Sequence, residues 1–260
     1  TTPVRQEAVQ AAVQAMTEGW GNPSSRYALG TKVAEQVKVW RKQVADALGC
    51  QSQELVFTSC GTEGNNWAIQ AAIWQNRRVG RHIVTTTVEH NAVLNCCKQL
   101  QLEGYEVTYV APDTNGDLTA EMILDAVRED TAVVSVMMVN NELGNIYPVA
   151  EIAAGLKKIN PKTLLHTDAV QAVGHLKINV KEENIDMLSL SAHKFHGPKG
   201  VGVLYARRGF PLTNVIEGGA QERGKRAGTE NIAGICGLAA AMKDACDHID
   251  DNMPRVAAMR

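Results

Sequence analysis

A lysine stands between two short apolar runs, in a turn whose other residues are mostly polar or small. Lys194 lies in the segment 189–200, which reads SLSAHKFHGPKG. A surface position is the usual interpretation of a single lysine. A lysine amine among hydroxyl, imidazole and glycine groups also has what a Schiff base with a carbonyl compound requires, so its partners in such chemistry must come from elsewhere in the chain.

A carboxylate and a helix-opening turn are the candidate partners. Asp168 ends an apolar run in the segment 166–171, and the segment 59–66, which contains Gly61 and Thr62, opens a predicted helix. Free amides and the positive end of a helix dipole suit a phosphate group. Taken singly, Asp168 and Thr62 are equally well explained as helix caps.

The three groups together indicate one cofactor. Pyridoxal 5′-phosphate (PLP) needs a lysine amine for the Schiff base, a carboxylate that keeps its pyridine nitrogen protonated, and a cradle for its phosphate. Lys194, Asp168 and the turn at Gly61 and Thr62 supply these groups. The sequence therefore predicts a PLP site in which Lys194 holds the cofactor.

The elements that must position these groups alternate between strands and helices. Short β-branched runs predict seven strands, at residues 55–58, 82–86, 107–110, 132–137, 163–167, 187–190 and 202–205. Helices are expected at residues 31–48, 62–75, 92–103, 120–128, 149–159 and 231–249. This alternation is typical of an α/β fold with a mainly parallel seven-stranded sheet covered by helices on both faces. Ligands bind at the carboxyl ends of the strands of such a sheet, where Asp168 and Lys194 fall.

Composition excludes several classes of function. Lys plus Arg total 26 against 28 Asp plus Glu, and the basic residues form no stripe, so we expect no nucleic-acid partner. The longest apolar stretch, 232–242, is far shorter than the roughly 20 residues that span a bilayer, so we expect no membrane segment and a cytoplasmic location. The six cysteines lack a C-x-x-C pair and zinc-site spacing, so no metal is expected. A nucleotide-binding module is disfavoured because neither glycine-rich nucleotide pattern occurs.

Ordered motifs along nearly the whole chain resemble one family. The sequence shows TTP at 1–3, GNPSS at 21–25, VFTS at 56–59, GTE at 61–63, EH at 89–90, VNNE at 139–142, DAVQ at 168–171, SAHK at 191–194, QER at 221–223 and GT at 228–229. This set resembles the fold-type I PLP enzymes of aminotransferase class V, and among them the cysteine desulfurases of the NifS and IscS kind. The pattern departs at Cys60, where the family usually has Gly, and at Tyr27, where His is common.

The resemblance implies catalytic and ring-binding roles. Lys194 is the Schiff-base lysine, and Asp168 pairs with the pyridinium nitrogen. His90 stacks on the ring and helps to move protons. Asn141 and Gln171 contact the phenolic oxygen of the cofactor or the substrate.

The resemblance also implies how the phosphate is held. Gly61 and Thr62 contribute the helix-opening turn, while Ser191 and His193 contribute the turn that carries the lysine. Thr229 reaches across from the other subunit of a homodimer. A homodimer with shared sites is therefore expected.

One domain is expected within the chain. By resemblance, residues 1–260 form the PLP-binding large domain with an N-terminal arm. The family's C-terminal small domain, with the arginine that binds the substrate carboxylate and the cysteine that forms a persulfide, is expected beyond Arg260. None of the six cysteines matches the position of that nucleophile.

The activity implied by the resemblance is that of a cysteine desulfurase, which removes sulfur from L-cysteine and gives L-alanine and an enzyme-bound persulfide. A sulfur-acceptor protein, such as a scaffold for iron–sulfur cluster assembly, is the implied partner. A selenocysteine lyase, or another class V lyase or aminotransferase, would share every residue named above. A non-catalytic sulfur-transfer scaffold is the alternative from another class, and the presence of Lys194, Asp168 and His90 argues against it.

Overall fold

A single sheet forms the centre of the computed structural model, which describes residues 1–259. Its strand order is β1-β7-β6-β5-β4-β2-β3. β7 runs antiparallel to both of its neighbours, whereas the other neighbouring pairs are parallel. The strands are β1 (Leu55–Thr58), β2 (His82–Thr86), β3 (Glu106–Val110), β4 (Thr131–Ser135), β5 (Leu164–Asp168), β6 (Met187–Ser191) and β7 (Gly202–Ala206). The predicted seven-stranded, mainly parallel sheet is confirmed.

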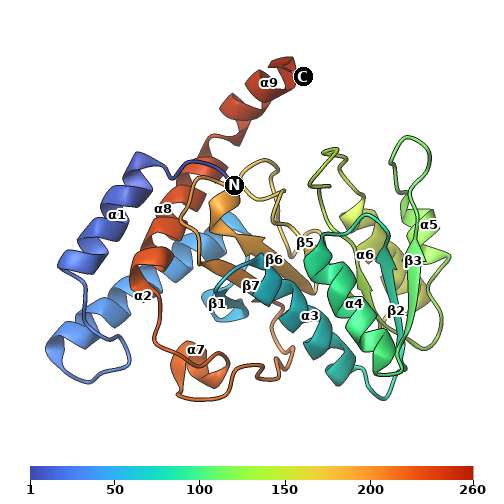
Figure 1. The fold of residues 1–260 in the computed structure, drawn as a ribbon, viewed down its shortest axis with the longest axis horizontal. Helices are drawn as coiled ribbons and strands as arrows, with labels where there is room; N and C mark the ends of the chain where they lie inside the picture. Colours follow the sequence, from blue (N-terminus) through green and yellow to red (C-terminus); the bar gives the residue numbers. More distant parts are fainter. Residues whose placement is uncertain (260) are drawn as a thin grey trace.

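Helices cover both faces of this sheet (Figure 1). On one face lie α3 (Gly61–Gln75) and α4 (Asn91–Leu102). The other face is covered by α2 (Ala28–Ala47), α5 (Ala120–Leu124), α6 (Val149–Ile159) and α8 (Ile232–Asp247). Of the remaining helices, α1 (Gln6–Thr17) packs on α8, whereas α9 (Ile249–Met259) projects away from the sheet. The short elements are α7 (Gln221–Gly224) and two 3-10 turns, η1 (Ser52–Glu54) and η2 (Ala192–Lys194).

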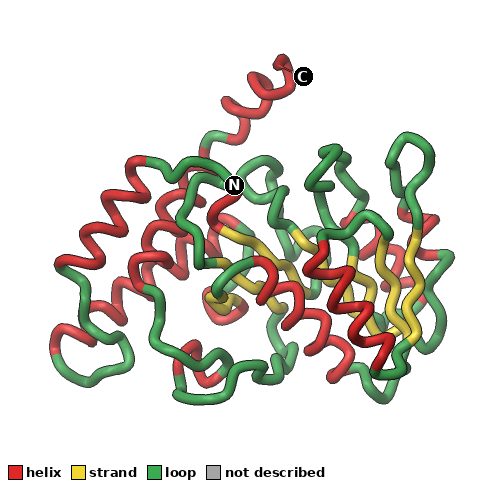
Figure 2. The backbone as a smooth tube through the Cα atoms, viewed as in Figure 1, coloured by secondary structure: helices red, strands yellow, loops and turns green. Residues whose placement is uncertain are grey.

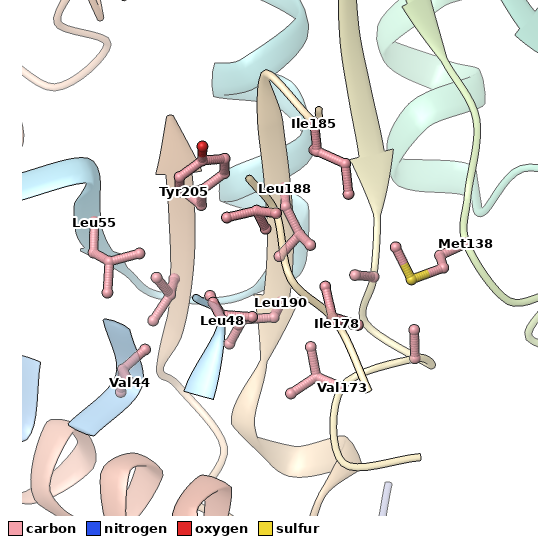
Figure 3. Packing of buried hydrophobic residues seen from close by; sticks show 14 of the residues in the cluster. Val44, Leu48, Leu55, Met138, Val173, Ile178, Ile185, Leu188, Leu190 and Tyr205 are labelled. Atoms are coloured by element: carbon pink, nitrogen blue, oxygen red, sulfur yellow. The ribbon is translucent and has the colours of Figure 1, made fainter. Parts of the chain in front are cut away.

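Successive strand residues enter opposite cores. Val84 and Leu188 belong to the cluster beneath α2 and α8, whereas their neighbours Ile83 and Met187 belong to the cluster beneath α3 and α4. Because side chains alternate along a strand, a sheet covered on both faces needs apolar residues at nearly every position. Figure 3 shows part of the first cluster, where Val44 of α2 lies near strand residues such as Leu55 and Leu190.

Side chains bond the free edge of β1, which pairs only with β7. The carbonyl of Leu55 accepts hydrogen bonds from Arg41 (3.1 Å) and Arg223 (2.6 Å). The amide of Phe57 donates to Glu222 (3.1 Å), which in turn forms a buried bidentate ion pair with Arg41 at 2.6 and 2.8 Å. Glu222 and Arg223 adopt left-handed conformations, with φ of 48° and 60°. This ion pair therefore anchors α7 to the sheet edge.

Four predicted elements have boundaries that are wrong by two residues or more. The helix expected at 31–48 begins earlier, at Ala28. The helix expected at 120–128 ends at Leu124, because the chain must turn back into β4 and Thr131 accepts the amide of Arg128 at 2.7 Å. The strand expected at 132–137 ends at Ser135, although the backbone amides of Val136 and Met138 still bond to β5. The helix expected at 231–249 divides at His248, and α9 follows.

Residues 1–259 contain neither a membrane-spanning helix nor a cluster of metal ligands. No helix there is long and apolar enough to cross a membrane. No group of three or more His, Cys, Asp or Glu side chains in this part of the chain is arranged to hold a metal ion.

Candidate active site

The predicted site residues gather at one edge of the sheet. β1 is antiparallel to β7 and β7 to β6, so the carboxyl end of β1 lies at the same edge as those of β2, β4, β5 and β6. Nine of the ten predicted residues follow these strand ends: Gly61, Thr62, His90, Asn141, Asp168, Gln171, Ser191, His193 and Lys194. The topology thus brings together segments that are far apart in the sequence.

Lys194 lies in the tight connection between β6 and β7. It ends η2, and the amides of Phe195 and Gly197 both donate to the carbonyl of Ala192, which closes the turn at 3.1 and 2.9 Å. The ring of Phe195 is buried and anchors the turn. Lys194 is half-buried, whereas Lys199 in the same connection is exposed. Because no crossover helix separates β6 from β7, the two strands pair antiparallel and the lysine is held at their junction.

The N-terminal residues line this turn. The amide and hydroxyl of Thr2 donate to the carbonyl of His193 at 2.9 and 3.0 Å, and the hydroxyl of Thr2 accepts from the amide of His196 at 2.8 Å. Thr1 bonds to the Nδ1 atom of His193 at 3.0 Å. Burial, followed by the neighbouring charge of Lys194, lowers the pKa of His193. The segment therefore buttresses the backbone beside Lys194.

Asp168 is a buried carboxylate at the end of β5. Its Oδ1 atom accepts the amide of Val170 at 2.9 Å, and its Oδ2 atom accepts the side-chain amide of Asn65 at 2.6 Å. Burial raises the pKa of Asp168, while the hydrogen bonds from Val170 and Asn65 and the charges of His90 and Lys194 act in the opposite direction. Each oxygen has one protein donor and retains a lone pair for a further donor.

His90 caps the N-terminus of α4. Its Nδ1 atom accepts the amide of Ala92 at 3.1 Å, so the proton of the neutral ring is on Nε2. The ring is exposed at the sheet edge. The preceding residue, Glu89, is buried and points inward, where its Oε1 atom accepts the amide of Met137 (2.7 Å) and the hydroxyl of Thr86 (3.1 Å). Burial, mainly, raises the pKa of Glu89 to about 8, so its carboxyl group is neutral at pH 7.

The turn before α3 has the form of an anion cradle. Gly61 begins the 15-residue helix, whose first amides have no partner within the helix. A Cβ atom at Gly61 would lie 2.6 Å from a methyl group of Val170, so glycine lets the turn pack directly against Val170. Glu63 accepts the amide of Ser59 at 2.7 Å and pairs with Arg226 at 2.9 and 3.2 Å, which fixes the turn from behind.

The residues at this edge fit PLP. Seven buried polar atoms lack a hydrogen-bond partner within residues 1–259, and four of them lie at these strand ends, namely Ser191 Oγ, Thr167 Oγ1, Asn65 Oδ1 and Glu89 Oε2. Buried polar atoms normally have partners, so orphans next to a glycine cradle are typical of a site that receives a polar ligand. The carboxylate of Asp168 is suited to a ring N–H group, and the amine of Lys194 is suited to an aldehyde.

Three other predicted residues have less defined surroundings. Asn141 and Gln171 are half-buried. The neighbour Asn140 forms the turn after β4, because its side chain accepts the amides of residues 142 and 143 at 2.9 and 2.8 Å. Thr229 is exposed on the long loop between β7 and α8 (Figure 2), and within residues 1–259 no hydrogen bond joins its side chain to the other predicted residues.

The six cysteines are all free thiols. Cys60 is half-buried at the N-cap of α3. Burial raises the pKa of the other five, in two cases to about 12 and in two to about 11: Cys50, Cys97, Cys96, Cys236 and Cys246. A raised pKa keeps a thiol protonated at pH 7 and makes it a poor nucleophile.

Two residues at the site, Asn65 and Glu89, had no role predicted from the sequence. A signal for Asn65 exists, because it occupies the face of α3 that also carries Ala68, Ile69 and Ala72 and is a polar residue on an apolar stripe. Glu89 comes three residues after the end of β2 and belongs to the EH pair at 89–90, but its burial cannot be inferred from that pair.

Known proteins resemble this chain along its whole length. Residues 1–251 match the family described as "Aminotransferase class-V". The chain is 46% identical over 260 residues to "Cysteine desulfurase IscS" from Methanosarcina thermophila and 45% identical to the protein of that name from Clostridium botulinum. Each alignment covers 100% of this chain but only 64% and 65% of the respective relative, so the chain spans less than two thirds of their length.

Solved structures give the same picture. A "NIFS-LIKE PROTEIN" superposes with a TM-score of 0.96 at 39% identity, covering 100% of this chain and 72% of that one. "SspA in complex with cysteine" superposes with a TM-score of 0.89 at 36% identity, covering 94% of this chain and 70% of that one. With a carboxylate, a lysine and a glycine cradle at one sheet edge and this likeness throughout, the chain belongs to the aminotransferase class-V family.

Proposed function

We propose that this chain is the cofactor-binding part of a PLP-dependent cysteine desulfurase. The observation that carries the proposal is the buried Asp168 carboxylate, held by Val170 and Asn65 at the same sheet edge as the Lys194 turn and the Gly61 cradle. A solvated or capping aspartate would have no need of this burial. The names of the relatives, and the cysteine bound to one of the similar structures, support L-cysteine as the substrate.

Each residue would act on a defined atom. Bound PLP supplies an electron sink for the substrate's α-carbon. Asp168 would hold the proton of the ring nitrogen, and Lys194 would be the group that holds the cofactor and that moves a proton at the α-carbon. His90 would stack on the ring and help to move protons. Gly61, Thr62, Ser191 and His193 hold the phosphate, and Asn141 and Gln171 contact the phenolic oxygen or the substrate.

The sulfur-transfer step needs a nucleophilic thiol. We assign it to a cysteine outside residues 1–260, in the small domain that the resemblance implies, since burial raises the pKa of five of the six thiols described above. Residues 1–260 are accordingly assigned to the large domain. A homodimer, a sulfur-acceptor protein of the iron–sulfur assembly type and a cytoplasmic location complete the proposal.

Borohydride reduction followed by peptide mapping tests the core of this proposal. Protein saturated with PLP should be yellow, and reduction should fix one phosphopyridoxyl group on Lys194. Lys199, exposed in the same connection, is the matched control, and a label on Lys199 would contradict the assignment. Incubation of protein that also contains the region assigned to the nucleophilic cysteine, with L-cysteine and with L-selenocysteine, followed by measurement of L-alanine, then separates a desulfurase from a selenocysteine lyase.

A further inference from the structure

Asn65 is a polar residue at a position where packing favours an apolar one. It lies one turn into α3, is only 1% exposed, and shares its helix face with Ala68, Ile69 and Ala72. Asparagine is a poor helix former, and burying its amide costs free energy unless the amide is fully bonded. Yet its Oδ1 atom is buried without a partner. The residue is therefore unfavourable for the fold alone.

The one side-chain hydrogen bond of Asn65 within residues 1–259 goes to Asp168. The distance from Asn65 Nδ2 to Asp168 Oδ2 is 2.6 Å, and the amide of Val170 occupies the other oxygen at 2.9 Å. An amide N–H group can donate to an ionised carboxylate, so this bond favours the charged form of Asp168. The bond also fixes the carboxylate plane, because α3 and β5 hold its two ends in separate elements.

Other charged groups face Asp168 as well. His90 and Lys194 favour its ionised form, and Glu89 lies close enough to oppose it. Lys194 loses its free amine when it carries a cofactor, and Glu89 is neutral at pH 7. Asn65 and Val170 thus donate to Asp168 whether or not the cofactor is bound. Val170 donates through its backbone amide, so only the Asn65 donor can be removed by substitution.

We propose that Asn65 is a positioning residue for Asp168, whose amide keeps the carboxylate ionised and oriented toward the ring nitrogen of PLP. The inference rests on the proposed function, in which Asp168 holds the ring proton. Asn65 would touch neither substrate nor cofactor and would act through Asp168. A ring that keeps its proton is positively charged and lowers the pKa of the nitrogen that links it to Lys194.

The test is a pH titration of the visible absorption band of the PLP-loaded protein, with the dissociation constant of PLP measured in parallel. Asn65→Leu preserves shape and removes the donor, and the pKa of the Lys194–cofactor linkage should rise by at most about one to two units, the value of the lost hydrogen bond to Asp168. Asn65→Asp should shift it further in the same direction, because two adjacent carboxyl groups share a proton. The rate of α-deuterium loss from labelled L-cysteine should fall by about tenfold or more in both variants, with little change in KM.

Asn66→Leu is the matched control. It makes the same chemical change one residue along α3, where the amide donates only to the backbone carbonyls of Thr62 and Ala92 at 2.9 and 3.1 Å, and the linkage pKa should stay unchanged. Thermal unfolding verifies that each variant folds, and Asn65→Ser replaces Asn65→Leu if the latter does not. Unchanged linkage pKa and PLP affinity in the Asn65 variants, with a large shift in Asp168→Asn, would overturn the inference and leave the proposed function intact. If Asp168→Asn also left the linkage pKa and the PLP affinity unchanged, that result would count against the proposed function itself.

Discussion

Two buried carboxyl groups at the strand ends have different hydrogen-bond arrangements. Asp168 accepts donors on both oxygens, from Val170 and Asn65, and faces the cations of the site, which together support its ionised form. Glu89 places both of its donors on Oε1 and leaves Oε2 buried without a partner, and burial raises its pKa to about 8. Burial raises the pKa of both acids, and the hydrogen bonds and nearby cations of Asp168 oppose that rise.

Glu89→Gln should change the pH dependence of stability. Because the folded-state pKa of about 8 lies above the ordinary 4.5, the stabilisation from Glu89 is complete below pH 4.5 and is lost as the pH rises through 8. The loss amounts to about 4–5 kcal/mol at most, at 1.36 kcal/mol per pKa unit. Urea unfolding at pH 5 and pH 8 should therefore show a smaller decrease for Glu89→Gln than for the wild type. Glu121→Gln, exposed on α5, is the control, and an equal decrease in Glu89→Gln and wild type would refute the neutral state.

Buried histidines link the strands of the sheet from within. His166 of β5 bonds to the hydroxyl of Ser135 on β4 at 2.9 Å and to that of Ser189 on β6 at 3.1 Å. His82 of β2 joins Thr131 and Thr108 in the same way, both at 2.8 Å. Each imidazole spans three strands, so its charge state affects the sheet as a whole.

Acid should weaken the sheet through His166. Burial lowers its pKa from 6.5 to about 3, so the folded state keeps the ring neutral while the unfolded chain binds a proton. This contribution to the free energy of unfolding is complete above pH 6.5 and is lost as the pH falls toward 3. About 2 kcal/mol of it is lost between pH 7 and pH 5. Replacement by Gln should remove that part of the pH slope in chemical denaturation. His248→Gln, at the exposed end of α8, should retain the wild-type slope, and an unchanged slope in His166→Gln would exclude His166 as its source.

The ion pair between Arg41 and Glu222 should be worth far more than a surface pair. Its side chains are 10% and 3% exposed, and removing one partner of a buried pair leaves an uncompensated charge that costs about 3–5 kcal/mol. Glu222→Ala should lower the free energy of unfolding by about that amount, with strong coupling in a double-mutant cycle with Arg41→Ala. The pair of Lys38 and Glu35 on α2, 70% and 64% exposed, is the control, for which a cycle should give less than about 1 kcal/mol. Equal coupling energies for the two pairs would contradict the prediction.

The strands could be predicted from sequence because a sheet covered on both faces requires continuous apolar runs. The sheet edge that carries the candidate site could be predicted because Asp168 and Lys194 follow two of these runs. α1 could not, because its buried residues are the small Ala8 and Ala15, whereas Val13 and Met16 are exposed. An apolar periodicity therefore identifies the wrong face. The partner of Asp168, Asn65, was equally hidden, since the contact joins two elements 103 residues apart.

At the scale of the whole molecule, one long loop connects β7 with α8. It is held at two points, by Glu222 on Arg41 at the edge of β1 and by Arg226 on Glu63 behind the cradle turn. Gly228 and Thr229, which follow the second anchor, are exposed. A loop this long is usually functional, and its anchoring keeps the exposed tip in one conformation, as a shared site between two subunits would require.

Mixing two inactive variants tests the shared site. Lys194→Ala removes the lysine, and Thr229→Ala removes the phosphate contact that we assign to the opposite subunit. If Thr229 serves the partner, a mixed dimer contains one site with both groups intact, so PLP retention by the mixture should exceed the average of the separate variants. Sedimentation velocity establishes that mixed dimers form. Retention equal to the average would place Thr229 in its own subunit's site or in none.

The covered edge of β1 affects how readily the protein aggregates at high concentration. An unpaired strand edge is a template on which a strand of another molecule can add, and this route leads to aggregates. Arg41, Glu222 and Arg223 already occupy the outward groups of Leu55 and Phe57, so this template is blocked by side chains from the chain itself. In a chain whose α7 has not yet packed against β1, these outward groups are unpaired. Newly made molecules are therefore most prone to intermolecular strand addition before α7 packs.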